Sequence, residues 1–336
     1  MITPTAEPDR HVSLGVWPTP VEQAPRLAAA IGLGIDDLWV KRDDLTGLGG
    51  GGNKVRKLEW TVGGAVADGA DTLITTGAPQ SNHARLTAAA GARLGLGVIL
   101  VFPGSHGSAG SGNLALDGLL GARVAWVGDV DATGLAKAAA DIAAHVQAQG
   151  RRPALIPFGG SNVTGARGYL GCGRELQAQL PKIDNVVVAL GSGGTMAGLV
   201  AALGPDVVLG IDTGARSDPL SAVSEFATGL MSKPLLTSDF RVRFDMVGSG
   251  YANLGEPVAS AMSLAATTEG IILDPIYSGR AMAGLIAAVA EEQIKPGETT
   301  VFMHTGGLPG LFGHQDAIHR AESSLRGLDT LASHPR

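Results

Sequence analysis

The sequence has little cysteine and no excess of positive charge. Cys172 is the one cysteine among 336 residues, which excludes an internal disulfide and a cysteine-rich zinc site and is typical of a reducing compartment. With 25 basic and 31 acidic residues, the formal charge is −6, so no broad basic surface is available for nucleic acid or an anionic membrane. We therefore expect neither of these as a partner, and no bound metal.

Long hydrophobic runs are also missing. No uncharged apolar segment approaches the roughly 20 residues that cross a bilayer as a helix. The first fifteen residues, MITPTAEPDRHVSLG, lack the charged and apolar regions of an export signal. We expect a cytoplasmic protein.

Aromatic residues make up only 4% of the chain and hydrophobic residues 45%, so the core must consist mainly of Val, Leu, Ile and Ala. Short β-branched runs alternate with Ala-rich stretches, which is the βαβ pattern. Strands are expected at 71–76, 97–102, 122–127, 185–190, 206–212 and 299–304. Helical spacing of apolar residues predicts helices at 53–69, 81–94, 131–149, 161–180, 194–204, 256–268 and 278–292. The sequence thus predicts an α/β fold in which helices flank mainly parallel strands.

Glycine is abundant, with 50 residues, roughly twice the usual share. Four glycines at 49–52 precede Asn53 and Lys54 at the start of an expected helix, so the backbone can approach a ligand near free helix amides. The helix N-terminus and the nearby cations Arg56 and Lys57 should lower the pKa of Lys54, as a Schiff-base lysine requires. The alternative is a solvated lysine in a flexible loop.

A second glycine-rich turn follows the strand predicted at 185–190. It consists of Gly191, Ser192, Gly193, Gly194 and Thr195. Converging amides, two hydroxyls and a helix dipole would hold a phosphate. No lysine follows the glycines as in an ATP or GTP loop, so the turn suits a single phosphate ester, and an ordinary tight turn is the alternative.

Polar residues stand where other expected helices begin. Ser81, Asn82 and His83 follow the strand predicted at 71–76, and ligands bind outside the carboxyl ends of strands in open α/β sheets. Ser81 could instead be an N-cap, and His83 a buried histidine at a helix start. Ligand binding and helix capping are likewise both open for Tyr277, Ser278 and Thr305.

Taken together, the motifs resemble those of the fold type II pyridoxal phosphate (PLP) enzymes, in particular the family of 1-aminocyclopropane-1-carboxylate deaminase and D-cysteine desulfhydrase. In order, they are KRDD (41–44), GGNKVRKLE (51–59), QSNHAR (80–85), GGSN (159–162), GSGGT (191–195), DPIYSGRA (274–281) and HTGG (304–307). The resemblance implies PLP as cofactor and two open, twisted, mainly parallel sheets flanked by helices, as in the tryptophan synthase β family. It also implies a large PLP-binding domain (1–50 and 165–336), a small domain (51–164) and a homodimer.

The resemblance assigns the cofactor-binding residues. Lys54 carries PLP, with Asn53 beside it, and Asn82 lies against the ring hydroxyl. Residues 191–195 hold the phosphate. The hydroxyl of Ser278 or of Thr305 faces the pyridine nitrogen.

It also implies how a small amino-acid substrate is held. Ser81, Asn82 and His83 bind the substrate carboxylate, and Tyr277 lines the substrate side. Lys54, released from the cofactor, is the base that removes the Cα proton. The predicted catalytic residues are therefore Lys54, Ser81 and Tyr277.

Three places in the sequence separate substrates within the family. Deaminases resemble SNQ, YEG and HLGG, whereas desulfhydrases resemble SNH, Y[ST]G and HTGG, as this chain does at 81–83, 277–279 and 304–307. A hydroxyl beside the pyridine nitrogen leaves the ring a weaker electron sink than a carboxylate does, which suffices for β-elimination from cysteine. The sequence predicts a PLP-dependent carbon–sulfur lyase that converts D-cysteine to pyruvate, hydrogen sulfide and ammonia. Arg280 departs from the lysine common in the family.

Other functions stay open. L-cysteate sulfo-lyase, which releases sulfite, shares the SNH and serine-type features, and 1-aminocyclopropane-1-carboxylate deaminase is a further alternative. A non-catalytic protein that binds a phosphate ligand would need the glycine turn but not Lys54. A nucleotide-dependent transferase is disfavoured because GxGxxG and GxxxxGK[ST] do not occur where such folds require them.

Overall fold

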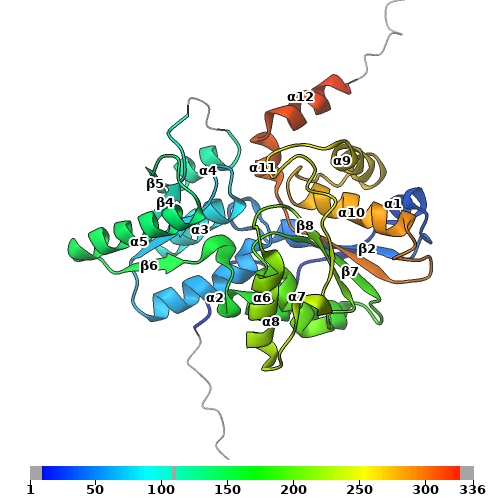
Figure 1. Ribbon diagram of the computed structural model, residues 1–336, viewed down its shortest axis with the longest axis horizontal. Helices are drawn as coiled ribbons and strands as arrows, with labels where there is room; N and C mark the ends of the chain where they lie inside the picture. Colours follow the sequence, from blue (N-terminus) through cyan, green and yellow to red (C-terminus); the bar gives the residue numbers. More distant parts are fainter. Residues whose placement is uncertain (1–9, 108–110, 326–336) are drawn as a thin grey trace, which may run out of the picture.

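Two sheets organise residues 10–107 and 111–325, the part of the chain that the computed structural model describes (Figure 1). The larger sheet has the strand order β1-β2-β10-β7-β8-β9. Its strands are β1 (Val21–Gln23), β2 (Leu38–Arg42), β7 (Asn185–Leu190), β8 (Val208–Asp212), β9 (Arg241–Arg243) and β10 (Thr300–His304). All neighbours are parallel except β1 and β2.

The smaller sheet, at the left of Figure 1, is parallel throughout, with the order β5-β4-β3-β6. Its strands are β3 (Thr72–Thr76), β4 (Gly97–Phe102), β5 (Arg123–Trp126) and β6 (Pro153–Ile156). The division into a large domain (1–50 and 165–336) and a small domain (51–164) stays a prediction. Residues 1–9, 108–110 and 326–336 of these predicted domains lie outside the described part of the chain.

Helices cover both faces of each sheet. Along the larger sheet, Val187 and Ala189 pack with α1, α9 and α10, whereas Val186 and Val188 pack with α6, α7 and α8, as the alternation of a strand requires. In the smaller sheet Leu73 faces α2 and α3. The helices are α1 (Pro25–Ile31), α2 (Lys54–Ala67), α3 (Asn82–Leu94), α4 (Asn113–Leu119), α5 (Ala132–Ala148), α6 (Val163–Gln179), α7 (Gly194–Leu203), α8 (Pro219–Met231), α9 (Glu256–Glu269), α10 (Ser278–Ala290), α11 (Leu308–Phe312) and α12 (Gln315–Ser323).

The predicted α/β fold with two mainly parallel sheets is confirmed, and each of the six expected strands is present. Four strands were not expected. Among them, β2 lacks a continuous apolar run because it contains Lys41. This lysine is buried and paired with Glu175. The strand β6 is short and begins with Pro153, which the β-branched pattern does not favour.

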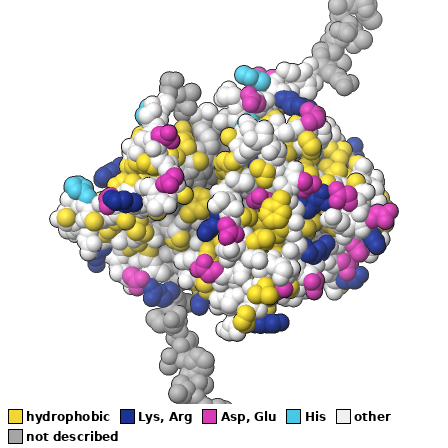
Figure 2. Space-filling view, in the orientation of Figure 1, with side chains coloured by type: hydrophobic (Ala, Val, Ile, Leu, Met, Phe, Trp, Pro, Cys, Tyr) yellow, Lys and Arg dark blue, Asp and Glu magenta, His cyan; other side chains and the backbone are white. Residues whose placement is uncertain are grey.

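Charges of both signs are interspersed on the face shown in Figure 2, without a continuous basic surface there. Among the described helices, none combines the length and the apolar character that crossing a membrane requires. Within the same residues no three His, Cys, Asp or Glu side chains are grouped as metal ligands.

Candidate active site

A cavity lies where the N-terminus of α2 meets the carboxyl ends of β7 and β10. Of the predicted residues, it is lined by Asn53, Lys54, Asn82, Gly191, Ser192, Gly193, Thr195, Tyr277 and Thr305. Ser81, His83, Gly194 and Ser278 are not among the lining residues. Parallel strands end together at this edge, so the topology gathers segments that are far apart in the sequence.

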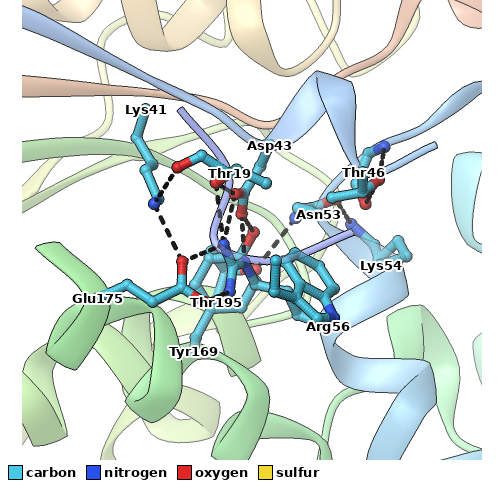
Figure 3. Close-up of polar contacts among 12 residues, drawn as sticks. Thr19, Lys41, Asp43, Thr46, Asn53, Lys54, Arg56, Tyr169, Glu175 and Thr195 are labelled. Atoms are coloured by element: carbon cyan, nitrogen blue, oxygen red, sulfur yellow. Dashed lines mark hydrogen bonds and ion pairs between the residues drawn. The ribbon is translucent and has the colours of Figure 1, made fainter. Parts of the chain in front are cut away.

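The glycine run that precedes Lys54 is required by its backbone. All four glycines at 49–52 have positive φ, and a Cβ at Gly51 would lie 1.9 Å from the carbonyl oxygen of Asp44. The hydroxyl of Thr46 accepts a hydrogen bond from Gly52 N at 2.9 Å, which closes the turn (Figure 3). The turn thereby delivers Lys54 as the first residue of α2.

Lys54 has the lowered pKa that the sequence predicts. Burial, with a smaller contribution from Arg85, lowers the pKa to about 8, against the opposing effect of Asp274. Arg56 is not the cause, because it turns away from the cavity to pair with Asp43 and Glu175. The amine of Lys54 donates to Asn53 Oδ1 at 3.0 Å and lies 5.7 Å from the ring centre of Tyr277.

The turn between β7 and α7 has the features of a phosphate site. Gly193 has a φ of 93°, and Cβ atoms at Gly194 and Gly159 would lie 2.7 Å and 2.3 Å from the hydroxyls of Ser161 and Ser192. The backbone therefore runs too close to its neighbours for larger residues. Ser192, Gly193 and Thr195 line the cavity where a ten-residue helix begins, and the free amides and hydroxyls of such a place fit a phosphate ester.

Lys57 lines the same cavity, although the sequence singled it out only as a nearby charge. It is buried, and its amine donates to Gly159 O at 3.2 Å and to Ser161 Oγ at 2.9 Å. Ser161 in turn hydrogen-bonds Ser192 at 2.7 Å. Burial and the nearby Lys54 hold the pKa of Lys57 well below its usual value. Its spacing of three residues from Lys54 on one helix was the available signal.

Of the three predicted residues at the start of α3, only Asn82 lines the cavity. Ser81 is the N-cap and accepts from Ala84 N at 3.2 Å. His83 is buried against Thr75, with 2.8 Å between Nε2 and the hydroxyl, and it does not reach the cavity. Asn82 lines the cavity, and its Oδ1 accepts a hydrogen bond from Asn113 Nδ2 at 2.9 Å. Burial keeps the pKa of His83 well below its usual value, so the imidazole is neutral.

A second cavity adjoins the first and shares Asn82, Asp274 and Tyr277 with it. Tyr251 and His314 line this side. The hydroxyls of Tyr251 and Tyr277 are 2.5 Å apart, and the rings meet edge to face. Burial, with the nearby Tyr251 adding to it, raises the pKa of Tyr277 well above its usual value, so this phenol keeps its proton at neutral pH. Sequence reasoning missed Tyr251, which lies in an irregular segment.

Of the two hydroxyls considered for the pyridine nitrogen, Thr305 lines the cavity. Ser278 is fully buried and donates to Asp274 Oδ1 at 2.6 Å. Asp274 also accepts from the amides of Tyr277 and Ser278, both at 2.9 Å. The serine is therefore engaged in shaping the turn before α10.

Comparisons with known proteins show which family of enzymes the chain resembles. The family model described as pyridoxal-phosphate dependent enzyme matches residues 12–306. The chain is 39% identical over 312 residues to a D-cysteine desulfhydrase of Klebsiella pneumoniae (strain 342), covering 88% of this chain and 94% of that protein. It is 38% identical over 324 residues to a Pyrococcus abyssi (strain GE5 / Orsay) protein provisionally named a 1-aminocyclopropane-1-carboxylate deaminase, covering 92% and 94%.

Solved structures of similar proteins have the same fold as this chain. The crystal structure of an ACC deaminase homologue, 37% identical, superposes with a TM-score of 0.83 and covers 92% of this chain and 95% of that one. An O-ureido-L-serine synthase, 18% identical, has a TM-score of 0.67 over 93% of this chain and 94% of that one, which supports the fold alone.

Proposed function

The chain belongs to the family of pyridoxal-phosphate dependent enzymes, and from this premise we propose that it catalyses β-elimination on D-cysteine. The reaction consumes D-cysteine and one water and yields pyruvate, hydrogen sulfide and ammonia. PLP, when bound, supplies an aldehyde that takes up amines and a ring that withdraws electrons from the substrate Cα. The residues of the cavity hold this group and move the protons.

The residues around the cavity have separate tasks in this proposal. The amides and hydroxyls of 191–195, with Lys57, would hold the phosphate, Asn82 would contact the ring hydroxyl, and Thr305 would contact the pyridine nitrogen; all of these except Gly194 line the cavity. The N-terminus of α3 beside Ser81 binds the substrate carboxylate. These contacts would hold the substrate with its Cα beside Lys54.

Proton transfer falls to Lys54 and the two tyrosines. Lys54 Nζ accepts the proton from Cα, because a pKa of about 8 leaves part of the amine uncharged near neutral pH. Tyr277 keeps its proton and is hydrogen-bonded to Tyr251, so it can donate to the departing sulfur. This pair gives the leaving group its proton without bulk water.

The observation that carries the choice of cysteine is Thr305, whose hydroxyl side chain lines the cavity, together with Ser278, which stands where a deaminase would place a glutamate. A neutral group at the pyridine nitrogen suits elimination of a good leaving group. Apart from Lys54, Lys57 and His314, no basic side chain among the described residues lines either cavity. This favours the uncharged thiol of cysteine over the sulfonate of L-cysteate.

A deaminase acting on 1-aminocyclopropane-1-carboxylate is the second candidate, because relatives with that name are as similar as the desulfhydrases are. Assays of purified protein with D-cysteine, L-cysteine, L-cysteate and aminocyclopropane carboxylate separate the candidates. We expect sulfide and pyruvate in equal amounts from D-cysteine. Sulfite from L-cysteate, or 2-oxobutanoate from the cyclopropane without sulfide from cysteine, would replace the proposal.

The resemblance also implies a homodimer, and this belongs to the proposal. Phe312, Leu308 and Ile272 are large apolar side chains exposed by 57%, 47% and 45%. They lie in or next to α9 and α11, and exposed apolar groups of this kind mark contact surfaces. Sedimentation velocity should give twice the mass of the chain.

A further inference from the structure

Arg280 is a fully buried cation without a carboxylate partner. It lies in the first turn of α10, and among the described residues no acidic group forms an ion pair with it. Burying an unpaired guanidinium is costly, so the structure must supply other acceptors. These acceptors show what the residue does.

All acceptors of Arg280 are main-chain carbonyls. One terminal nitrogen donates to Thr213 O at 2.5 Å, directly after β8. The other donates to three carbonyls of one segment, those of Gly250, Tyr251 and Asn253, at 2.8, 2.9 and 3.0 Å. One side chain therefore connects the end of β8 to the segment that carries Tyr251.

That segment has no regular structure of its own, and apart from the pair of Asp245 with Arg243 and the packing of Met246 and Leu254 on the core, it is held at Tyr251 from outside. Residues 244–255 between β9 and α9 contain no helix or strand, and the hydrogen bonds between Val247 and Gly250 and between Gly250 and Asn253 are long, at 3.4 and 3.3 Å. Besides Arg280, the side chain of His314 contacts it, with Nε2 2.9 Å from Ala252 O. The position of Tyr251 thus depends on contacts from outside the segment.

The hydroxyl of Tyr251 is hydrogen-bonded to that of Tyr277, which lines both cavities. The two hydroxyls are 2.5 Å apart, and the ring of Tyr277 lies 5.7 Å from the amine of Lys54. A displacement of the segment by an ångström would break this hydrogen bond. Proton transfer is sensitive to displacements of this size.

We propose that Arg280 is a positioning residue: it binds the carbonyls of residues 250, 251 and 253 and thereby holds Tyr251 on Tyr277. It contacts neither substrate nor cofactor and acts through the tyrosine pair. Lysine has a single nitrogen and cannot place donors on both sides as a planar guanidinium does. Only the kinetic part of the test rests on the proposed function.

The direct test follows the tyrosines themselves. The chain has only three, Tyr169, Tyr251 and Tyr277, so labelling the Cζ carbons with ¹³C gives three NMR signals, which single Tyr→Phe variants assign. In cofactor-loaded protein at pH 8, Arg280→Gln should move the Tyr277 signal to its position in Tyr251→Phe. Tyr169, hydrogen-bonded to Asp43, should not move and reports that the fold is intact. An unchanged Tyr277 signal would overturn the proposal.

Two further variants complete the test. Arg280→Lys should give an intermediate shift, and it replaces the glutamine variant if that one does not fold. Arg241→Gln is the matched control, because Arg241 also donates to a backbone carbonyl, that of Asp206, but contacts no residue of the cavities. It should leave all three signals unchanged.

Kinetics give a second readout. Arg280→Gln should lower kcat by about tenfold or more, up to the roughly 10²- to 10⁴-fold that general acid catalysis contributes, with KM little changed. When Tyr251 is already replaced by Phe, Arg280→Gln should lower kcat almost no further. If the losses in kcat of the two single variants multiply in the double variant, the proposal is contradicted. If the unmodified enzyme has no activity on any substrate, the proposed function fails, while the NMR signals still decide the role of Arg280.

Discussion

Lys54 shows how a single side chain is tuned by its surroundings. Burial lowers its pKa to about 8, so about a tenth of the amine is uncharged at pH 7, compared with less than about a thousandth for an ordinary lysine. Asp274 opposes this shift and prevents a larger one. This is the condition that the proposed roles of Lys54, attack on an aldehyde and later acceptance of a proton, require.

The pH dependence of cofactor capture tests this tuning. Only the uncharged amine of Lys54 attacks, and its fraction is about one half at the pKa and nearly complete about one pH unit above it. The rate at which cofactor-free protein binds PLP should therefore rise from pH 6, be half-maximal near the pKa of about 8, and level off about one unit above it. Stopped-flow absorbance measures this rate. A rate that keeps rising toward pH 10 would mean an unperturbed lysine.

At this scale the sequence indicated the position of some cavity residues more clearly than that of others. Lys54 and residues 191–195 carry a local signal, because glycines, a helix start and hydroxyls stand together. Tyr251 has no such signal and reaches Tyr277 only through the fold. His83 stands beside Asn82 in the sequence, but the helix turns its ring toward Thr75 and away from the cavity.

Among the elements, helix α2 carries the lysine on one side and a buried ion network on the other (Figure 3). Arg56 donates to Asp43 at 2.8 Å and to Glu175 of α6 at 2.8 Å. Burial alone would raise the pKa of Asp43, but the charge and hydrogen bonds of Arg56, together with hydrogen bonds from Tyr169 and Thr19, outweigh it and lower the pKa. The network thus fixes α2 between β2 and α6.

Removing the arginine should be costly. Arg56→Met leaves Asp43 buried without its counter-charge, so we expect a loss of about 3–5 kcal/mol in the free energy of unfolding. Urea unfolding measures it. The control is Arg151→Met, which breaks the exposed pair with Asp71 and should cost less than about 1 kcal/mol. Equal losses in the two variants would contradict this role of the network.

The turn before α7 permits a matched pair of glycine variants. Gly193 and Gly204 have φ of 93° and 94°, but a Cβ at Gly193 would lie 3.1 Å from Ala222, whereas nothing lies within 4 Å at Gly204. Both alanine variants should lose stability by about 1–3 kcal/mol through backbone strain. Fluorescence titration should show weaker PLP binding, by about tenfold, for Gly193→Ala only. Equal affinities would argue against a phosphate at this turn.

At the scale of the whole molecule, the cavity draws on both sheets. Lys54 and Asn82 lie in helices beside the smaller sheet, whereas Thr305 and residues 191–195 follow strands of the larger one. The fold class follows from the sequence because the buried parallel strands are continuous apolar runs. The edge strands β1 and β9 are short and polar, so only the finished sheet defines them.

A cofactor held from both sides should stabilise the whole molecule. Binding to the folded state alone adds about 2.7 kcal/mol at a hundredfold excess over Kd. Differential scanning calorimetry should show a higher Tm with PLP than without. Pyridoxal, which lacks the phosphate, should raise it much less. An equal rise with pyridoxal would mean that residues 191–195 do not hold a phosphate.

The central claim is that Lys54 carries the cofactor, and one measurement tests it directly. Borohydride reduction of the PLP-loaded protein makes the bond between lysine and cofactor permanent, and mass spectrometry of the digested protein locates it. We predict a single modified peptide with the added mass on Lys54. A modification on Lys57, on several surface lysines or on no residue would contradict the account.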